Sequence, residues 1–168
     1  MTTDLVSVRT ARTGDAAAIA HIHEEAWRNA YQGLIPHLPL SQMIARRGPG
    51  WWQGTLSKGM AALVLEFDDE LAGYVTLGRS RMRGTSYGGE LFELYVRPDY
   101  QGVGFGGRLF RAARAELEVH GIDGLCVWSL ADNDLACAFY LQLGGRQISE
   151  GTEKFGESIL RKVAFAWR

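Results

Sequence analysis

The chain has 168 residues, 46% of them hydrophobic and 22% charged, which predicts a single globular domain over residues 1–168 and excludes a disordered chain. Its formal net charge of −1 gives no general attraction to nucleic acid or an anionic membrane, and no stretch reaches the ~18 apolar residues of a spanning helix. The N-terminus has no signal-like apolar segment, and Cys126 and Cys137 stand in apolar surroundings, so we expect a cytoplasmic protein with buried, unpaired thiols.

The first 60 residues predict one strand and one long helix, followed by an irregular segment. Alternating valines at residues 6–8 begin the strand. Thr13 or Asp15 then offers the N-cap of a helix over residues 15–30. One face of this helix is apolar and carries Ile19, Ile22 and Ala26. Residues 33–59 are rich in glycine and proline, which indicates short helices within irregular structure.

Three strands are predicted next. Residues 61–67 and 72–78 form the first two, and Asp68-Asp69-Glu70 between them indicates a hairpin turn. The third covers residues 88–97 and stops at Arg97-Pro98, because proline cannot donate a hydrogen bond to a sheet.

A glycine-rich loop leads from the third strand into a helix. Four of the six residues from 102 to 107 are glycine. Apolar residues then recur every four positions and predict a buried helical stripe of Phe105, Leu109, Ala113 and Leu117. Gly121 ends this helix, and residues 125–130 form a short buried strand. The order strand, helix, strand over residues 90–130 predicts a right-handed parallel crossover.

A second helix begins near Asn133 and ends at Gly144. Its apolar face is expected to carry Leu135, Phe139 and Leu143. The remaining tail to Arg168 has room for two more strands. Since the earlier and later strands read as antiparallel, the whole chain predicts a mixed sheet with helices on its faces.

The glycine loop indicates an anion-binding site. A loop without side chains at the start of a helix lets backbone N–H groups approach and hold an anion, here the pyrophosphate of a nucleotide-like cofactor. Residues 102–107 also match the GxGxxG pattern of dinucleotide-binding folds, with Asp132 downstream. Residues 97–101 separate the strand from the first glycine, and little chain is left for a doubly wound sheet, which disfavours that alternative. A turn that only lets helix and sheet pack closely is the other alternative.

Two linked motifs resemble the GNAT superfamily of N-acetyltransferases. The segment LYVRPDYQGVGFGGRLF, residues 94–110, resembles motif A, whose core positions here are Gln101, Gly104 and Gly106. The segment NDLACAFYLQLGG, residues 133–145, resembles motif B, with matching positions at Asn133, Ala136, Phe139, Tyr140 and Gly144. Residues 26–36 are more weakly similar to the substrate-side helices of small-molecule members.

The resemblance implies a fold and a reaction. The fold is α/β (α+β): a mixed, mostly antiparallel twisted sheet of six to seven strands with helices on both faces and a central parallel strand pair splayed around the acyl-CoA. The reaction transfers the acetyl group of acetyl-CoA, as co-substrate, to a primary amine of a small molecule or peptide. Residues 1–60 are expected mainly on the substrate side, and residues 88–145 are expected to form the acetyl-CoA-binding core.

The resemblance also implies the residues that bind the cofactor, which are Tyr95, Val96, Gln101, Gly102, Val103, Gly104, Phe105, Gly106, Gly107 and Asn133. Val103 replaces the basic residue usual after the first motif glycine, so binding would depend on backbone N–H groups, with Arg108 as a helper. Gly145 replaces the usual aromatic residue, and we expect it to loosen the final strands.

Two carboxylates on the strand before the loop are candidate catalytic bases. An alkyl ammonium has a pKa of about 10 and must lose a proton before it attacks a thioester, which a carboxylate or a water held by it can accept. Glu90 and Glu93 are three positions apart, so a regular strand directs them to opposite faces, with Glu90 on the face of Leu94 and Val96. A bulge in the strand would reverse this assignment of faces, so Glu90 and Glu93 rank equally as the candidate base. A salt-bridged structural role is the alternative for each.

The remaining catalytic roles follow from the resemblance. Tyr140 matches the family tyrosine that protonates the leaving CoA thiolate, with a core tyrosine as the alternative. Backbone N–H near Tyr95 or Val96 would stabilise the oxyanion where the parallel strands separate. Asn133 would cap its helix, bond the pantetheine arm, or do both.

Aromatic residues are the candidates on the substrate side. Trp27 and Tyr31, with Trp51 and Trp52, suit an amine through cation–π contact, although each is also explained by core packing. The arginines of residues 79–84 indicate a solvated face, with contact to an acidic group as a minor alternative.

No metal site and no covalent enzyme intermediate are predicted. His21 and His23 are two apart on a helix and diverge, and the sequence shows no Cys-His or Ser-His arrangement. A non-catalytic acyl-CoA sensor or regulatory module is the alternative function. The amine is left open among an amino acid, a polyamine, an aminoglycoside and a protein N-terminus, and a homodimer is also left open.

Overall fold

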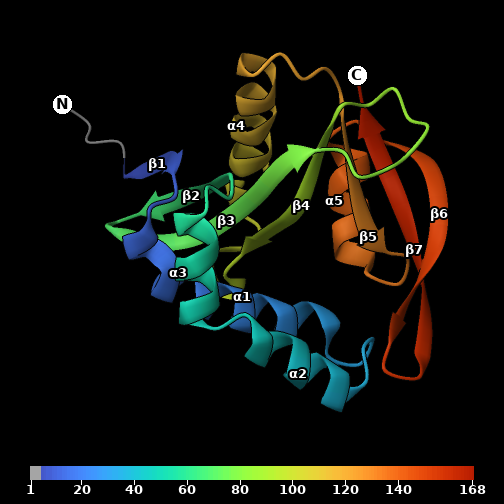
Figure 1. The fold of residues 1–168 in the computed structure, drawn as a ribbon, viewed down its shortest axis with the longest axis horizontal. Helices are drawn as coiled ribbons and strands as arrows, with labels where there is room; N and C mark the ends of the chain where they lie inside the picture. Colours follow the sequence, from blue (N-terminus) through green and yellow to red (C-terminus); the bar gives the residue numbers. More distant parts are fainter. Residues whose placement is uncertain (1–4) are drawn as a thin grey trace.

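The computed structural model describes residues 5–168 and has a central seven-stranded sheet (Figure 1). The strands are β1 (Val6–Thr10), β2 (Ala62–Phe67), β3 (Glu70–Arg79), β4 (Gly89–Val96), β5 (Leu125–Leu130), β6 (Arg146–Phe155) and β7 (Ser158–Trp167). Their order across the sheet is β1-β2-β3-β4-β5-β7-β6. Only β4 and β5 run parallel among these neighbours. The predicted mixed, mostly antiparallel sheet is therefore confirmed.

Helices cover both faces of the sheet. They are α1 (Ala16–Tyr31), α2 (His37–Arg46), α3 (Pro49–Ser57), α4 (Phe105–Val119) and α5 (Asp134–Gln142), with short 3₁₀ turns η1 (Thr13–Asp15) and η2 (Pro98–Tyr100). Helices α1 and α3 pack with Val64 and Tyr74 on one face. Helices α4 and α5 pack on the opposite face around Leu91 and Leu125, as Figure 1 shows behind the sheet. Helix α4 and strand β5 complete the predicted parallel crossover from β4.

Two predictions for the first 70 residues are confirmed and one is corrected. Asp68 and Asp69 join β2 to β3 with φ of 53° and 65°, the left-handed pair of a type I′ hairpin. The segment predicted to hold short helices within irregular structure contains α2 and α3, of 10 and 9 residues, which take up most of it. Asp15 precedes α1, but its carboxylate makes no cap hydrogen bond to this helix.

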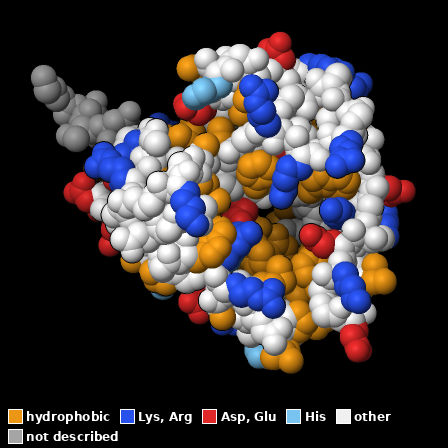
Figure 2. All heavy atoms as spheres, viewed as in Figure 1, with side chains coloured by type: hydrophobic (Ala, Val, Ile, Leu, Met, Phe, Trp, Pro, Cys, Tyr) orange, Lys and Arg blue, Asp and Glu red, His pale blue; other side chains and the backbone are white. Residues whose placement is uncertain are grey.

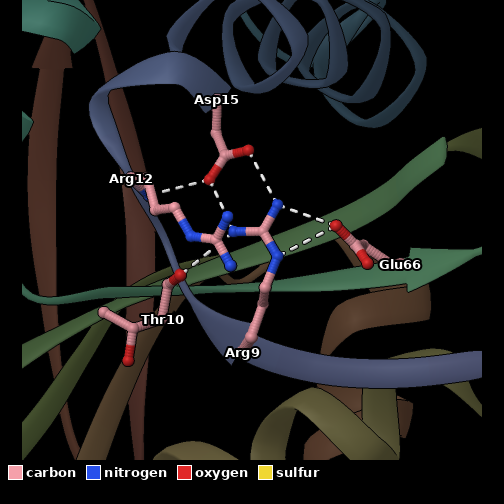
Figure 3. A network of polar contacts seen from close by, with 5 residues as sticks. All are labelled: Arg9, Thr10, Arg12, Asp15 and Glu66. Carbon is pink, nitrogen blue, oxygen red and sulfur yellow. Dashed lines mark hydrogen bonds and ion pairs between the residues drawn. The ribbon is translucent and has the colours of Figure 1, made fainter. Parts of the chain in front are cut away.

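The Asp15 carboxylate instead belongs to an ion network at the start of α1 (Figure 3). Arg9 of β1 donates to both oxygens of Asp15, at 2.8 and 2.9 Å. The Arg9 Nε donates to Glu66 of β2 at 2.9 Å, and the Arg12 amide donates to Asp15 at 2.7 Å. The hydrogen bond from Arg9 holds the pKa of Asp15 below its usual value, which stabilises the carboxylate form. The network therefore fixes the chain between the first strand and α1.

Strand β4 contains a bulge that determines which residues face which side. Its register with β3 pairs Thr76 with Glu93 and the next residue, Leu77, with Leu91, so Phe92 is the extra residue. Leu91 and Leu94 consequently both pack on the α4–α5 face. Glu90 and Glu93 lie together on the opposite face, where α1 packs. The regular-strand expectation that Glu90 shares the face of Leu94 is wrong, and the bulge is the reason.

Strands β4 and β5 separate soon after they begin. Their parallel register covers only Gly89–Leu91 against Leu125–Val127. Beyond it the two strands diverge, which is visible in Figure 1. We call the space between residues 92–96 and residues 128–130 the β4–β5 gap.

Helix α5 buries only part of the face that was predicted. Phe139 and Leu143 pack partly against the core, as expected, but Leu135 is 76% exposed, and Tyr140 is the buried residue of this helix. Because the apolar side chains surround this nine-residue helix, their sequence spacing does not decide which side packs.

Gly145 does not loosen the strands that follow. A Cβ at Gly145 would lie 2.5 Å from the Trp167 indole and 2.8 Å from the Tyr140 carbonyl oxygen, so a side chain has no room there. The indole of Trp167 fills this space instead, and β6 and β7 pair along their length.

Candidate active site

The glycine loop leads into the N-terminus of α4, which no side chain caps. Gly102 and Gly104 have φ of 82° and 88°, left-handed values that glycine adopts without strain. Gly104 precedes α4, no side chain caps this helix, and the first turn contains no acidic residue. The Arg108 amide donates to the Gly104 carbonyl as the first helical bond, so the amides of residues 105–107 have no acceptor within the helix. This arrangement suits an anion such as a pyrophosphate.

The glycines of the loop are required for different structural reasons. A Cβ at Gly106 would lie 3.1 Å from the Phe139 ring, so Gly106 serves the packing of α4 on α5. Added Cβ atoms at Gly102 and Gly104 would meet nothing within 4 Å, so these two positions are constrained by their backbone angles. Val103 is 63% exposed and supplies no charge. Arg108, in the first turn of α4, is half-buried.

The β4–β5 gap exposes main-chain groups of β4. The Arg97 amide donates to Ala72 on β3 at 2.8 Å. Because successive amides of a strand point to opposite sides, the Tyr95 amide also faces β3, whereas the Val96 amide faces the gap. The Gln101 side chain donates to the Val96 carbonyl at 3.3 Å, which links the glycine loop to this strand. Of the two predicted oxyanion donors, the geometry favours Val96.

Tyr140 lies on α5, on the α4–α5 side of the sheet. Its ring packs against Phe165 and Trp167, each with ring centroids 5.9 Å away. Burial, followed by the nearby Tyr31 hydroxyl, raises the pKa of Tyr140, so its hydroxyl keeps its proton at neutral pH. Tyr31 belongs to α1 on the other face of the sheet.

Asn133 caps α5. Its side-chain oxygen accepts a hydrogen bond from the Ala136 amide at 3.2 Å. The predicted capping role is confirmed, and the side-chain nitrogen is left for a second contact.

A buried polar cluster surrounds Glu93 on the α1 face. The Tyr74 hydroxyl donates to Glu93 at 2.7 Å, and His23 Nδ1 lies 3.1 Å from the same hydroxyl. The Arg47 guanidinium forms an ion pair with the other Glu93 oxygen. The Glu93 side chain is only 9% exposed. These four side chains, His23, Arg47, Tyr74 and Glu93, are called the Glu93 cluster below.

Sequence reasoning missed three residues of this cluster: Arg47 and Tyr74 were not considered for the site, and His23 was weighed only as a metal ligand. Its burial, followed by the nearby Arg47 charge, lowers its pKa to about 3, so the imidazole is neutral. Because Tyr74 gives its proton to Glu93, the neutral His23 must donate from Nδ1 to the Tyr74 oxygen. The signal available in the sequence was a histidine on the buried side of a helix.

Aromatic side chains form the walls beside this cluster. Tyr31 and Tyr95 share a hydrogen bond of 2.6 Å, and Trp27 packs edge-on against Tyr31 with ring centroids 5.4 Å apart. The Arg47 guanidinium lies over Trp51, 4.8 Å from its ring. Trp52 is fully buried beneath Tyr74 and belongs to the core. Figure 2 shows a hollow on this face of the molecule, with hydrophobic side chains inside it and basic side chains around its edge.

Glu90 has a different environment. It is 1% exposed, and it accepts hydrogen bonds from the Arg81 amide at 3.0 Å and the Arg81 guanidinium at 2.8 Å. It also lies opposite Cys126, where β4 and β5 are still paired. Both carboxylates form an ion pair with an arginine, so the structure separates the two candidates by position: Glu93 lies beside the gap, whereas Glu90 lies where β4 and β5 are paired. Arg81 of the segment expected to be a solvated arginine face supplies the ion pair of Glu90, with its side chain 72% exposed.

Three further observations concern residues 5–168. No group of three or more His, Cys, Asp or Glu side chains among them has the arrangement of a metal site. None of their helices has the length and apolar character needed to span a membrane. Cys126 and Cys137 are both free thiols, and burial raises the pKa of each.

Known proteins share this sequence pattern and architecture. Residues 17–144 match the model of the acetyltransferase (GNAT) family. The N-acetyltransferase YuaI of Bacillus subtilis, itself uncharacterized, is 26% identical over 163 residues, covering 97% of this chain and 93% of the relative. The PaiA N-acetyltransferase of Thermoplasma acidophilum, solved in complex with coenzyme A, superposes with a TM-score of 0.74 at 18% identity, covering 94% of this chain and 97% of PaiA. YncA of Salmonella typhimurium, solved with its cofactor acetyl-CoA, gives 0.68 at 22% identity, covering 98% and 94%.

Proposed function

The chain belongs to the acetyltransferase (GNAT) family, and we propose that it transfers the acetyl group of acetyl-CoA directly to a primary amine of a small molecule or peptide. One observation carries the proposal: a largely enclosed carboxylate with aromatic neighbours, Glu93, lies beside the β4–β5 gap, which the Val96 amide faces. We expect the Tyr140 hydroxyl to approach the same gap from the α4–α5 side. The N-acetyltransferase names of YuaI and PaiA and the coenzyme A and acetyl-CoA in the PaiA and YncA structures support it.

The residues present fit a coenzyme A molecule. The free amides of residues 105–107 would hold its pyrophosphate at the positive end of α4. Because Val103 replaces the usual basic residue, the main chain provides most of this contact, with Arg108 close by. The side-chain nitrogen of Asn133 would bond the pantetheine arm. When bound, acetyl-CoA supplies an activated acetyl thioester.

Glu93 is the proposed base, directly or through a water molecule. An ammonium entering between the aromatic walls has a pKa of about 10 and must give up a proton before its nitrogen can attack. Tyr74 fixes one Glu93 oxygen, and His23 fixes Tyr74. Glu90 is not proposed for this role, because it lies beside the paired part of the strands and not beside the gap.

Val96 and Tyr140 serve the other side of the reaction. As the nitrogen–carbon bond forms, the Val96 N–H stabilises the negative charge on the acetyl oxygen. As the carbon–sulfur bond breaks, Tyr140 gives its proton to the CoA thiolate, and the proton that the newly acylated nitrogen must lose restores the Tyr140 hydroxyl. Because burial raises its pKa, this hydroxyl is protonated at neutral pH and is available as a donor.

The test is to measure free CoA release from acetyl-CoA over a panel of amines, together with acetyl-CoA affinity by calorimetry. The proposal predicts binding and amine-dependent release. Tight acetyl-CoA binding with no release for any amine would instead favour the non-catalytic acyl-CoA sensor.

A further inference from the structure

The carboxylate proposed to receive the amine already has a cation of the chain beside it. Arg47 follows α2 and forms its ion pair with Glu93. Its guanidinium lies 4.8 Å from the Trp51 ring and 5.7 Å from the Trp27 ring. Its side chain is 32% exposed, so the charge is mostly enclosed by these partners. Two cation–π contacts and an ion pair therefore hold Arg47 at the acceptor side.

The Arg47–Glu93 pair restricts the charge of the acceptor. A simple ammonium that reached Glu93 would either share one carboxylate with Arg47 or leave Arg47 without its counter-charge. An enclosed charge without a partner is costly. A molecule carrying both an ammonium and a carboxylate avoids this cost, because its ammonium pairs with Glu93 while its carboxylate pairs with Arg47. A guanidinium can also hold a carboxylate through two hydrogen bonds.

The same contact restricts the spacing of the two charges. Arg47 and Glu93 touch each other, so the two charged groups of the ligand must also be close neighbours. An α-amino acid carries its ammonium and its carboxylate at this spacing. A peptide carries them farther apart, at its two ends, and a polyamine carries no carboxylate.

We propose that the acceptor is a free α-amino acid, with Arg47 reading its carboxylate and Glu93 taking the proton from its ammonium, so that the products are an N-acetyl amino acid and CoA. This inference rests on the proposed function. It makes Arg47 the residue that selects the acceptor. The side chain of the amino acid would lie among the hydrophobic side chains of the hollow in Figure 2, which favours apolar amino acids.

The experiment compares matched acceptors. L-leucine, L-methionine and L-phenylalanine are tested against their carboxamides, which keep the amine and lack the carboxylate. Acetylated product is measured by mass spectrometry, and kcat/KM is determined for each pair. We expect the wild type to prefer the acids by about tenfold to hundredfold, the value of one charge-assisted contact. At neutral pH a larger fraction of the amine is unprotonated in a carboxamide than in the corresponding acid. Amine reactivity alone would therefore favour the carboxamides, so a preference for the acids must come from the protein.

Variants assign the preference to Arg47. Arg47→Ala should lower the acid-to-amide ratio by the same factor, mainly through KM for the acids, and Arg47→Lys should restore part of it. Arg46→Ala is the matched control, because Arg46 is exposed at the neighbouring position. The ratio is measured within each variant, so a loss of folded protein does not change it.

Other results would overturn the inference. The carboxamides could be acetylated as fast as the acids or faster, or the acid-to-amide ratio of kcat/KM could stay unchanged in Arg47→Ala. Acetylation of none of the amino acids, with or without acetylation of spermidine or putrescine, would also overturn it. Calorimetry with acetyl-CoA distinguishes a failure of this inference from a failure of the proposed function. Binding together with turnover of another amine overturns the amino-acid acceptor alone, whereas absence of acetyl-CoA binding overturns the proposed function itself.

Discussion

Three partners from three parts of the chain hold Glu93. Tyr74 comes from β3, Arg47 from the segment between α2 and α3, and His23, through Tyr74, from α1. Such a carboxylate keeps one orientation, which general-base catalysis requires. It also means that no partner of Glu93 is close to it in the sequence, so its environment could not be read from its own strand.

The first prediction separates the two carboxylates of β4. Glu93→Gln keeps the shape of the side chain and removes the base, so kcat should fall about 10²- to 10⁴-fold with little change in acetyl-CoA affinity. Glu90→Gln is the matched variant on the same strand and should lower kcat only a few-fold, through its Arg81 pair. Steady-state kinetics with a confirmed acceptor makes the comparison, and the reverse ranking would reject Glu93 as the base.

Tyr140 carries the second prediction. Tyr140→Phe removes one hydroxyl and leaves the ring packed against Phe165 and Trp167, so kcat should fall about tenfold to hundredfold while acetyl-CoA affinity stays the same. Because burial raises the pKa of Tyr140, the wild-type rate should show no loss from its ionisation up to about pH 10. Unchanged turnover in the variant would remove Tyr140 from the acid role.

His23 links the cluster to acid stability. Burial lowers its folded-state pKa to about 3, whereas an unfolded histidine titrates near 6.5. Between these values the unfolded chain binds a proton that the folded chain does not, so His23 destabilises the fold as pH falls from about 6.5 toward 3. Urea unfolding over this range should show a shallower loss of stability in His23→Asn, which keeps a donor to Tyr74 without titrating. Equal pH dependence in both proteins would contradict a neutral buried His23.

At the scale of elements, the start of α4 provides the test of the anion site. Gly104→Val forces a branched residue into a left-handed φ of 88°, at a cost of about 1–2 kcal/mol, and places a side chain over the free amides. We expect at least a tenfold loss of acetyl-CoA affinity in the folded variant, measured by calorimetry.

Gly121→Val is the control for backbone strain. Gly121 has φ of 71°, lies just beyond the other end of α4, and its added Cβ would also meet nothing within 4 Å. This variant should lose similar stability and keep its acetyl-CoA affinity. If Gly104→Val folds and binds as tightly as Gly121→Val, the glycine loop is not the anion site.

The helices and strands themselves can be predicted from local sequence patterns, but which of their faces is buried cannot. The four-residue repeat from Phe105 predicted α4, and the apolar run at residues 125–130 predicted β5, because periodicity and length are properties of the segment alone. The bulge at Phe92 depends on how β4 pairs with β3, and this pairing decides where Glu93 points. The exposure of Leu135 depends on where α5 docks.

The candidate site was predictable to a similar extent. The glycine loop, Tyr140 and both carboxylates were identified from motifs and chemistry. The partners that distinguish Glu93 from Glu90, namely Tyr74, Arg47 and Arg81, come from other elements and required the fold. Gly145, an apparent weakness in the sequence, is explained only by the indole of Trp167.

At the scale of the whole molecule, we propose that the sheet separates two half-sites that meet at the β4–β5 gap. The α4–α5 side provides free amides and Tyr140, and the α1–α3 side provides the Glu93 cluster and its aromatic walls. A parallel strand pair that stops after three residue pairs creates the opening between them. In this proposal each side binds one substrate, and the opening between the strands lets the acetyl group pass from one to the other.

Calorimetric titration of acetyl-CoA into the purified, folded protein tests this account most directly. We predict one binding site per chain with Kd on the order of micromolar, as for ordinary enzyme substrates, and weakening of that binding by Gly104→Val. A folded protein that shows no heat of binding with acetyl-CoA or free coenzyme A would contradict the account.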